Sequence, residues 1–161
     1  MKIEILPMTT PAIPLAILSM TNLDNRELNP AIEKQLTSQQ IPVATPQSAL
    51  ADLIEVIHAK HPVNIQAWDM TALGLDEVQL KMTPNGATLL NDDQVLNPNL
   101  DSKSSRVLIV IGDPEATETT VHATGQELQR KLKIFFGIQA RLQFPMCSTE
   151  RLVLETTRPV S

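Results

Sequence analysis

The residues whose types and spacing best suggest chemistry lie in residues 112–120, between an apolar run and a long helical pattern. Where a buried strand ends and a helix begins, the free N–H groups of the helix attract anionic ligands. Threonine hydroxyls can donate hydrogen bonds to a phosphate, and a histidine one turn into the helix can join them. The candidate ligand-binding residues are Asp113, Thr117, Thr119, Thr120 and His122.

The same segment contains features that oppose an anion. Asp113, Glu115 and Glu118 would repel a phosphate, and no lysine follows a glycine as in a phosphate-binding loop. These acidic side chains can instead satisfy the helix N-terminus themselves. We therefore expect a helix cap here, with a small-molecule or anion site as the alternative.

A pair of histidines suggests a metal site but does not complete one. His58 and His61 lie three residues apart, a spacing that can share a metal on a helix. Two ligands are too few, and Pro62 disfavours helical geometry at His61. We expect these side chains to interact with the C-terminal end of a helix dipole instead.

A second partial metal pattern is Asn97, Asn99 and Asp101, which have the spacing of the first ligands in a calcium loop. The calcium template also needs glycine at its sixth position and glutamate at its twelfth. Those positions hold Ser102 and Leu108. We expect a solvated loop here and no metal.

No arrangement of catalytic residues is visible. Arg151 follows Cys147 too closely for the Cys-x5-Arg arrangement of phosphatases, and no Cys-x-x-Cys pair exists. The glycines are too far apart for a dinucleotide-binding motif or a nucleophile elbow. The sequence therefore favours a protein that is not an enzyme and has no catalytic residue and no cofactor.

The composition argues against nucleic acid as a partner. The formal net charge is −5, and the chain has three Phe, one Trp and no Tyr, so it lacks the clustered bases and rings that nucleic-acid surfaces use. The nearest approach to a basic cluster is Arg130, Lys131, Lys133 and Arg141. Charge is also uneven, since residues 1–100 hold five basic and eleven acidic side chains. Such asymmetry can align a protein with copies of itself or with a charged partner.

The sequence predicts a cytoplasmic protein that does not enter a membrane. Its most apolar run, residues 13–20, is too short to span a bilayer and lacks the flanking features of a signal peptide. One cysteine excludes an internal disulfide framework.

Apolar patterns and breakers predict the elements of the first half of the chain. We expect strands at residues 2–6 and 13–19, then a helix that begins at Asn29-Pro30 and runs to about Gln40. A second helix should begin near Thr45-Pro46, since Leu50, Leu53, Ile54 and Ile57 fall on one helical face.

The second half should form strands at residues 63–70, 78–82 and 87–90, with an Asn-Gly turn closing a hairpin between the last two. Residues 91–105 should form a long polar loop. Residues 106–111, which are apolar after Arg106, should form a strand buried on both faces. A helix over residues 117–136, ended by Gly137, and strands at 138–144 and 152–156 complete the chain.

These elements predict one α+β domain over residues 1–161. We expect a mixed, mainly antiparallel sheet of about six to eight strands with three helices, including a C-terminal β-α-β unit. Two functions stay open. The first is a non-catalytic assembly or accessory protein that acts through contacts with other protein subunits, including copies of itself. The alternative is a small-molecule or anion-binding enzyme subunit that uses the 112–120 strand-to-helix loop.

Overall fold

A computed structural model of the chain describes residues 2–6, 13–21, 49–61, 63–70, 77–83, 86–91, 94–96, 106–147 and 152–155. The described helices are α2 (Ala49–Lys60) and α4 (Glu118–Phe136). The strands are β1 (Lys2–Ile5), β2 (Ile13–Pro14), β3 (Ala16–Met20), β4 (Ile65–Asp69), β5 (Glu77–Thr83), β6 (Gly86–Asn91), β7 (Gln94–Leu96), β8 (Val107–Ile111), β9 (Arg141–Gln143), β10 (Met146–Cys147) and β11 (Leu152–Glu155).

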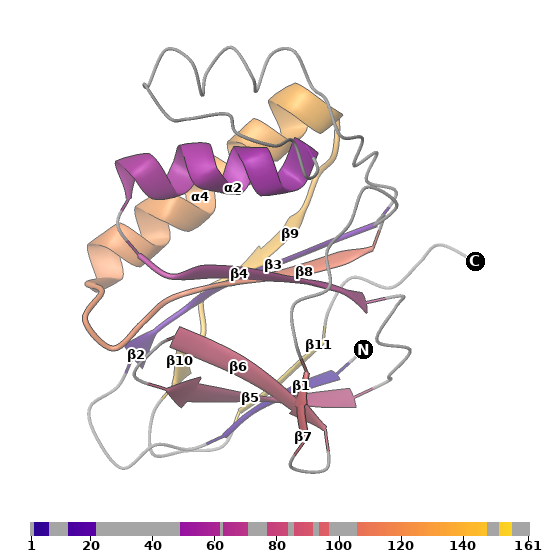
Figure 1. Ribbon diagram of the computed structural model, residues 1–161, viewed down its shortest axis with the longest axis vertical. Coiled ribbons are helices and arrows are strands. Elements are labelled where there is room, and N and C mark those ends of the chain that lie inside the picture. The colour runs from indigo at the N-terminus through magenta and orange to yellow at the C-terminus, as the bar shows by residue number, and fades with distance from the viewer. Residues whose placement is uncertain are drawn as a thin grey trace.

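These elements form three stacked layers (Figure 1). The helices lie on a four-stranded sheet with the order β4-β8-β3-β9, which we call the middle sheet. Its other side packs on a five-stranded sheet with the order β11-β1-β5-β6-β7, which we call the outer sheet. Strands β2 and β10 form a separate short pair. The prediction of a single sheet and three helices is therefore wrong: the described residues form two helices and two main sheets.

The middle sheet is antiparallel throughout and is buried on both faces at its centre. Every residue of β3 and β8 is buried, and β8 pairs with β3 on one side and β4 on the other. In β8, Val107, Ile109 and Ile111 join the core under the helices, and Leu108 and Val110 join the core between the sheets. Strand β8 is apolar throughout because its alternate side chains enter different cores.

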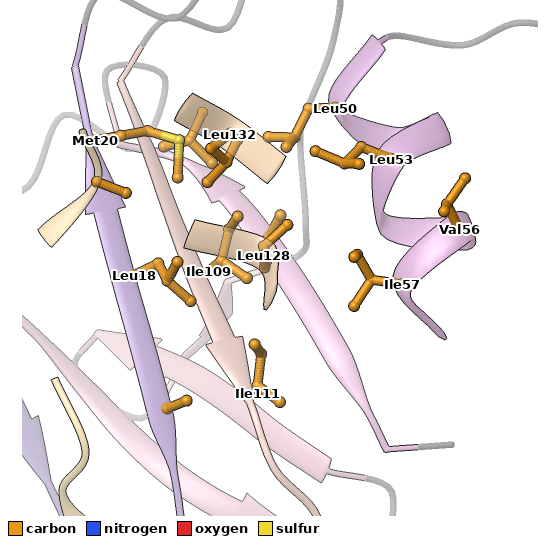
Figure 2. Close-up of a cluster of buried hydrophobic side chains, with 14 of the residues drawn as sticks. Leu18, Met20, Leu50, Leu53, Val56, Ile57, Ile109, Ile111, Leu128 and Leu132 are labelled. Atoms are coloured by element: carbon orange, nitrogen blue, oxygen red, sulfur yellow. The ribbon is translucent and has the colours of Figure 1, made fainter. Parts of the chain in front are cut away.

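The core under the helices is aliphatic. Leu50, Leu53 and Ile57 of α2 and Leu128 and Leu132 of α4 point toward the middle sheet (Figure 2). Their spacing places them on one face of each helix. Because the chain is nearly free of aromatic residues, branched aliphatic side chains fill this core.

The outer sheet has one buried face. Val78, Leu80 and Met82 of β5 enter the core between the sheets, while Glu77, Gln79 and Lys81 alternate with them on the far face. The hairpin of β5 and β6 is confirmed by antiparallel pairing, whereas β1 and β5 pair in parallel. The indole Nε1 of Trp68 in β4 donates a hydrogen bond to the carbonyl oxygen of Leu96 in β7, at 3.1 Å, and so ties the two sheets together.

The predicted C-terminal β-α-β unit has a third strand between its two strands. Strands β8 and β9 both pair antiparallel with β3, so they are parallel to each other but separated by β3. Helix α4 connects them across the face of the middle sheet. Its boundaries match the prediction, with Thr117 as N-cap and Gly137 as a left-handed C-cap.

Other expectations differ from the structure in detail. The expected strand at residues 13–19 is divided at Leu15 into β2 and β3, which join different sheets. The expected polar loop at 91–105 contains the edge strand β7, which sequence reasoning missed because only three residues pair. The predicted helix from Asn29 and the start signal at Thr45-Pro46 lie outside the described residues.

Candidate functional site

The 112–120 loop is held to the neighbouring strand entry by Gly112 and Asp113. The N–H of Gly112 donates to the carbonyl oxygen of Asn64 at 3.0 Å. In return, Oδ2 of Asp113 accepts a hydrogen bond from the N–H of Asn64 at 3.0 Å, and Oδ1 accepts one from Glu115 at 2.9 Å. Gly112 has φ of +150°, and a Cβ there would meet the carbonyl oxygen of Pro14 at 3.0 Å, so glycine suits this close approach. Both oxygens of Asp113 thus serve the loop's own geometry.

The threonines of the loop form the N-terminal cap of α4. Oγ1 of Thr117 accepts from the N–H of Thr120 at 3.2 Å and donates to Oγ1 of Thr120 at 2.9 Å. Oγ1 of Thr124 donates to the carbonyl oxygen of Thr120 at 2.6 Å. Thr119 is exposed beside them. This is the hydrogen-bond pattern of an N-cap, which satisfies donors that an anion would otherwise meet.

His122 lies one turn further along, on the flank of α4 that faces the end of β9. Its ring packs against Phe144 with centroids 4.1 Å apart. Its Nε2 is 3.9 Å from Oε1 of Glu118. The predicted site residues therefore fall into three groupings: Asp113 with Asn64, Thr117 with Thr120, and His122 with Phe144. The anion site at this loop stays a prediction.

A charged cluster between the two helices was not expected from the sequence. The carboxylate of Glu127 on α4 accepts a hydrogen bond from Nε2 of His61 at 2.5 Å and another from Nζ of Lys60 at 3.2 Å. Its side chain is 12% exposed, and the guanidinium of Arg130 lies 4.0 Å from it. Lys60 is the last residue of α2 and His61 follows it, so the cluster links the end of α2 to the middle of α4.

The electrostatics of this cluster favour an ionised carboxylate. Burial opposes ionisation of Glu127, but the hydrogen bonds from His61 and Lys60 and their positive charges outweigh burial and hold the pKa of Glu127 below its ordinary value of 4.5. The two hydrogen-bond donors therefore offset the desolvation cost of the Glu127 carboxylate. The cluster therefore acts first as a polar link between α2 and α4.

The same cluster separates the two histidines of the incomplete metal pattern. His61 is engaged by Glu127, while His58 lies exposed on α2. Within the described ranges, no group of three or more His, Cys, Asp or Glu side chains is placed to hold a metal ion. The residues Asn97, Asn99 and Asp101 lie outside the described part of the chain. No local signal could have revealed the cluster, because Glu127 and His61 are 66 residues apart.

A further feature is the far face of the outer sheet, which points away from the middle sheet. Register aligns five side chains in one row across all five strands: Val153, Glu4, Gln79, Leu90 and Val95. The two valines lie on the edge strands β11 and β7 and are 48% and 60% exposed. Alternation alone predicts a polar far face, so apolar side chains at both edges distinguish this one.

Neither a scan against protein-family models nor a search of curated proteins finds a match for this chain. Among the helices that the structure describes, none is long and apolar enough to cross a membrane. The features that bear on function are therefore the 112–120 loop, the cluster around Glu127 and the far face of the outer sheet.

Proposed function

We propose that this chain is a non-catalytic assembly or accessory protein that works through protein–protein contacts, most simply with a second copy of itself. The observation that carries the proposal is the far face of the outer sheet. Helices α2 and α4 pack on the middle sheet, on the opposite side of the molecule from this face (Figure 1). A partner protein could cover this face without displacing either core.

The exposed valines make burial of this face by a partner favourable. The edge strands β7 and β11 present Val95 and Val153 on this face, and their burial by a partner would remove apolar surface from water. Leu90, between them in the same row, is half-buried. Because these side chains are already partly covered, each would contribute less to an interface than the about 1.5–3 kcal/mol of a fully exposed side chain.

The candidate chemical groups support a non-catalytic reading. Asp113 and Thr117 are used in loop and cap hydrogen bonds, and Glu127 links two helices. We also propose a cytoplasmic location, on the basis of a single cysteine, and no nucleic-acid partner, on the basis of the net charge of −5.

The proposal is tested by the molar mass of the purified chain in solution, measured by light scattering over a range of concentrations. We expect a mass above that of the monomer, and a shift toward the monomer when Val95 and Val153 are both replaced by lysine. The matched control is Ile134→Lys, because Ile134 is 63% exposed on α4 in the helix layer. This control should leave the mass unchanged.

A pull-down from the source cell covers the case of a different protein partner. A partner of the proposed kind should bind the parent chain and the Ile134→Lys control but not the double lysine variant. A monomeric chain whose bound proteins are the same with and without the two valines would overturn the proposed function.

A further inference from the structure

We propose that two copies of this chain pack their outer sheets face to face across a two-fold axis, with β5 of one copy antiparallel to β5 of the other. This inference rests on the proposed function and deepens it, because it names the partner and the orientation. Strand β5 is the third of the five strands in the outer sheet. It therefore lies at the centre of the face that would be covered.

Strand β5 carries opposite charges at its two ends. Glu77 and Lys81 are both exposed on the far face, with Gln79 half-buried between them. Four residues of β-strand separate the two charges by roughly 13 Å, too far for them to pair with each other. Within the described part of the chain, neither side chain forms an ion pair.

The order of these charges selects the orientation of a second copy. A two-fold axis that lies in the face and crosses β5 at Gln79 reverses the strand. It sets Glu77 of each copy opposite Lys81 of the other. A parallel stack would instead oppose Glu77 to Glu77 and Lys81 to Lys81, and opposed like charges disfavour association. Closed two-fold dimers are also the commonest form of homo-oligomer.

The neighbouring strands are compatible with this orientation. On β1, the same operation sets the exposed Lys2 opposite Leu6, so like charges are not directly opposed there. Lys2 is the register partner of Glu77, so Glu77 would have a lysine of its own chain beside it as well as Lys81 of the other copy. Packed sheets lie about 10 Å apart with their strands within about 30° of alignment. Glutamate and lysine side chains that reach toward each other from facing sheets can span that gap.

Three apolar side chains of the face fall on the axis itself. The row Val153, Glu4, Gln79, Leu90 and Val95 runs along it, so each valine and Leu90 would meet its own copy. Glu4 is also in this row, but it is 9% exposed and already interacts within its own chain. Its side chain therefore presents little surface to the partner.

Charge reversal with rescue tests the pairing. Sedimentation equilibrium would give the dimer dissociation constant of the parent, of Glu77→Lys, of Lys81→Glu, and of the double variant that exchanges the two charges. Each single reversal opposes like charges at two symmetric places, and we expect the Kd to rise about tenfold or more. The double variant restores both pairs and should return the Kd to within about threefold of the parent.

Matched controls carry the same charge changes on the helix layer. Glu118→Lys and Lys133→Glu alter exposed positions of α4, and they should leave the Kd unchanged. Circular dichroism establishes that every variant is folded, and the rescue by the double variant does not depend on the stability of either single one. Added salt should weaken the parent dimer, because exposed ion pairs are screened.

The outcomes separate this inference from the proposed function. If neither single reversal changes the Kd, or if the double variant does not restore it, the two-fold pairing is overturned while assembly itself stands. A parent chain that stays monomeric at the highest concentration also overturns the pairing. Whether it still serves as an accessory subunit is then decided by the valine-dependent pull-down.

Discussion

The two sheets of this protein differ in how many of their faces are covered. All five residues of β8 in the middle sheet are buried, whereas β5 in the outer sheet alternates between buried and exposed side chains. Both strands are central in their sheets. The difference arises because helices α2 and α4 add a second core to the middle sheet. The alternation of buried and exposed side chains in a strand therefore depends on whether one or both faces of its sheet are covered.

Residues that stabilise the fold and residues that are available for contacts with a partner therefore lie in different parts of the molecule. Changes in the middle sheet or its helical cover disturb one of two cores, each made mainly of fully buried aliphatic side chains. Changes on the far face of the outer sheet disturb neither. Substitutions in the two regions should therefore differ in their effects on stability.

The largest loss of stability should come from Leu128→Ala in the helical cover. Leu128 is fully buried at the centre of the core above the middle sheet (Figure 2). Loss of burial and the resulting cavity should lower the free energy of unfolding by about 2–5 kcal/mol. Urea unfolding followed by circular dichroism measures it. A loss below about 1 kcal/mol would mean that the cover contributes little.

The next largest effect should come from Gly125→Leu, which pushes the helix away from the sheet. A Cβ at Gly125 would lie 3.0 Å from Cβ of Ala16 and 3.3 Å from Leu142 and Phe144 side-chain atoms. Overpacking should lower the free energy of unfolding by about 1–3 kcal/mol. The adjacent exposed position gives a control, Gln126→Leu, which should be nearly neutral. A Gly125→Leu protein as stable as the parent would show that α4 can shift freely.

A smaller and pH-dependent effect should follow from Glu127→Gln, which removes the charge that links α2 to α4. At neutral pH we expect a loss of about 1–2 kcal/mol, between the values for exposed ion pairs and buried charged hydrogen bonds. The pKa of Glu127 is lower in the folded chain than its ordinary value of 4.5. The stabilisation is therefore complete above pH 4.5 and is lost as the pH falls through the lower folded pKa.

Unfolding of the parent and the Glu127→Gln variant at a series of pH values measures this effect. The gap between the two curves should close on acidification. A gap that stays constant below the folded pKa of Glu127 would exclude the carboxylate as its source, and the loss would then come from packing.

The smallest effect should come from Val153→Ala on the far face of the outer sheet. Val153 is 48% exposed, and surface substitutions usually change stability by less than about 0.5 kcal/mol. The matched control is Val110→Ala in β8, whose side chain is fully buried between the sheets. It should lower the free energy of unfolding by more than about 1 kcal/mol. Equal losses at low protein concentration would erase the contrast between the sheets.

Local patterns in the sequence were enough to predict several elements. The run Val107–Ile111 predicted a strand buried on both faces, and the structure confirms it. Thr117 and Gly137 marked the ends of α4 because capping depends only on residues within one turn. Residues 78–82 were predicted to form a strand, and the structure confirms it as part of β5.

Partners distant in the chain could not be predicted in this way. The parallel pairing of β1 with β5, and the placement of β3 between β8 and β9, are set by packing between segments that share no local signal. That is why one sheet was expected where two exist. The link of Glu127 to His61 was missed for the same reason, and the candidate groups Asp113, Thr117 and His122 were identified without their separate partners.

By itself, the sequence determined both described helices and most of the described strands, because periodicity and capping act over a few residues. The tertiary structure alone decided how the strands divide between two sheets, and which face of the outer sheet stays open. It also decided that, among the residues that the structure describes, Glu77 and Lys81 of β5 form no ion pair while Glu127 is matched within the helix layer. Those properties depend on which distant segments pack together, since burial and electrostatic pairing are set by neighbours in space.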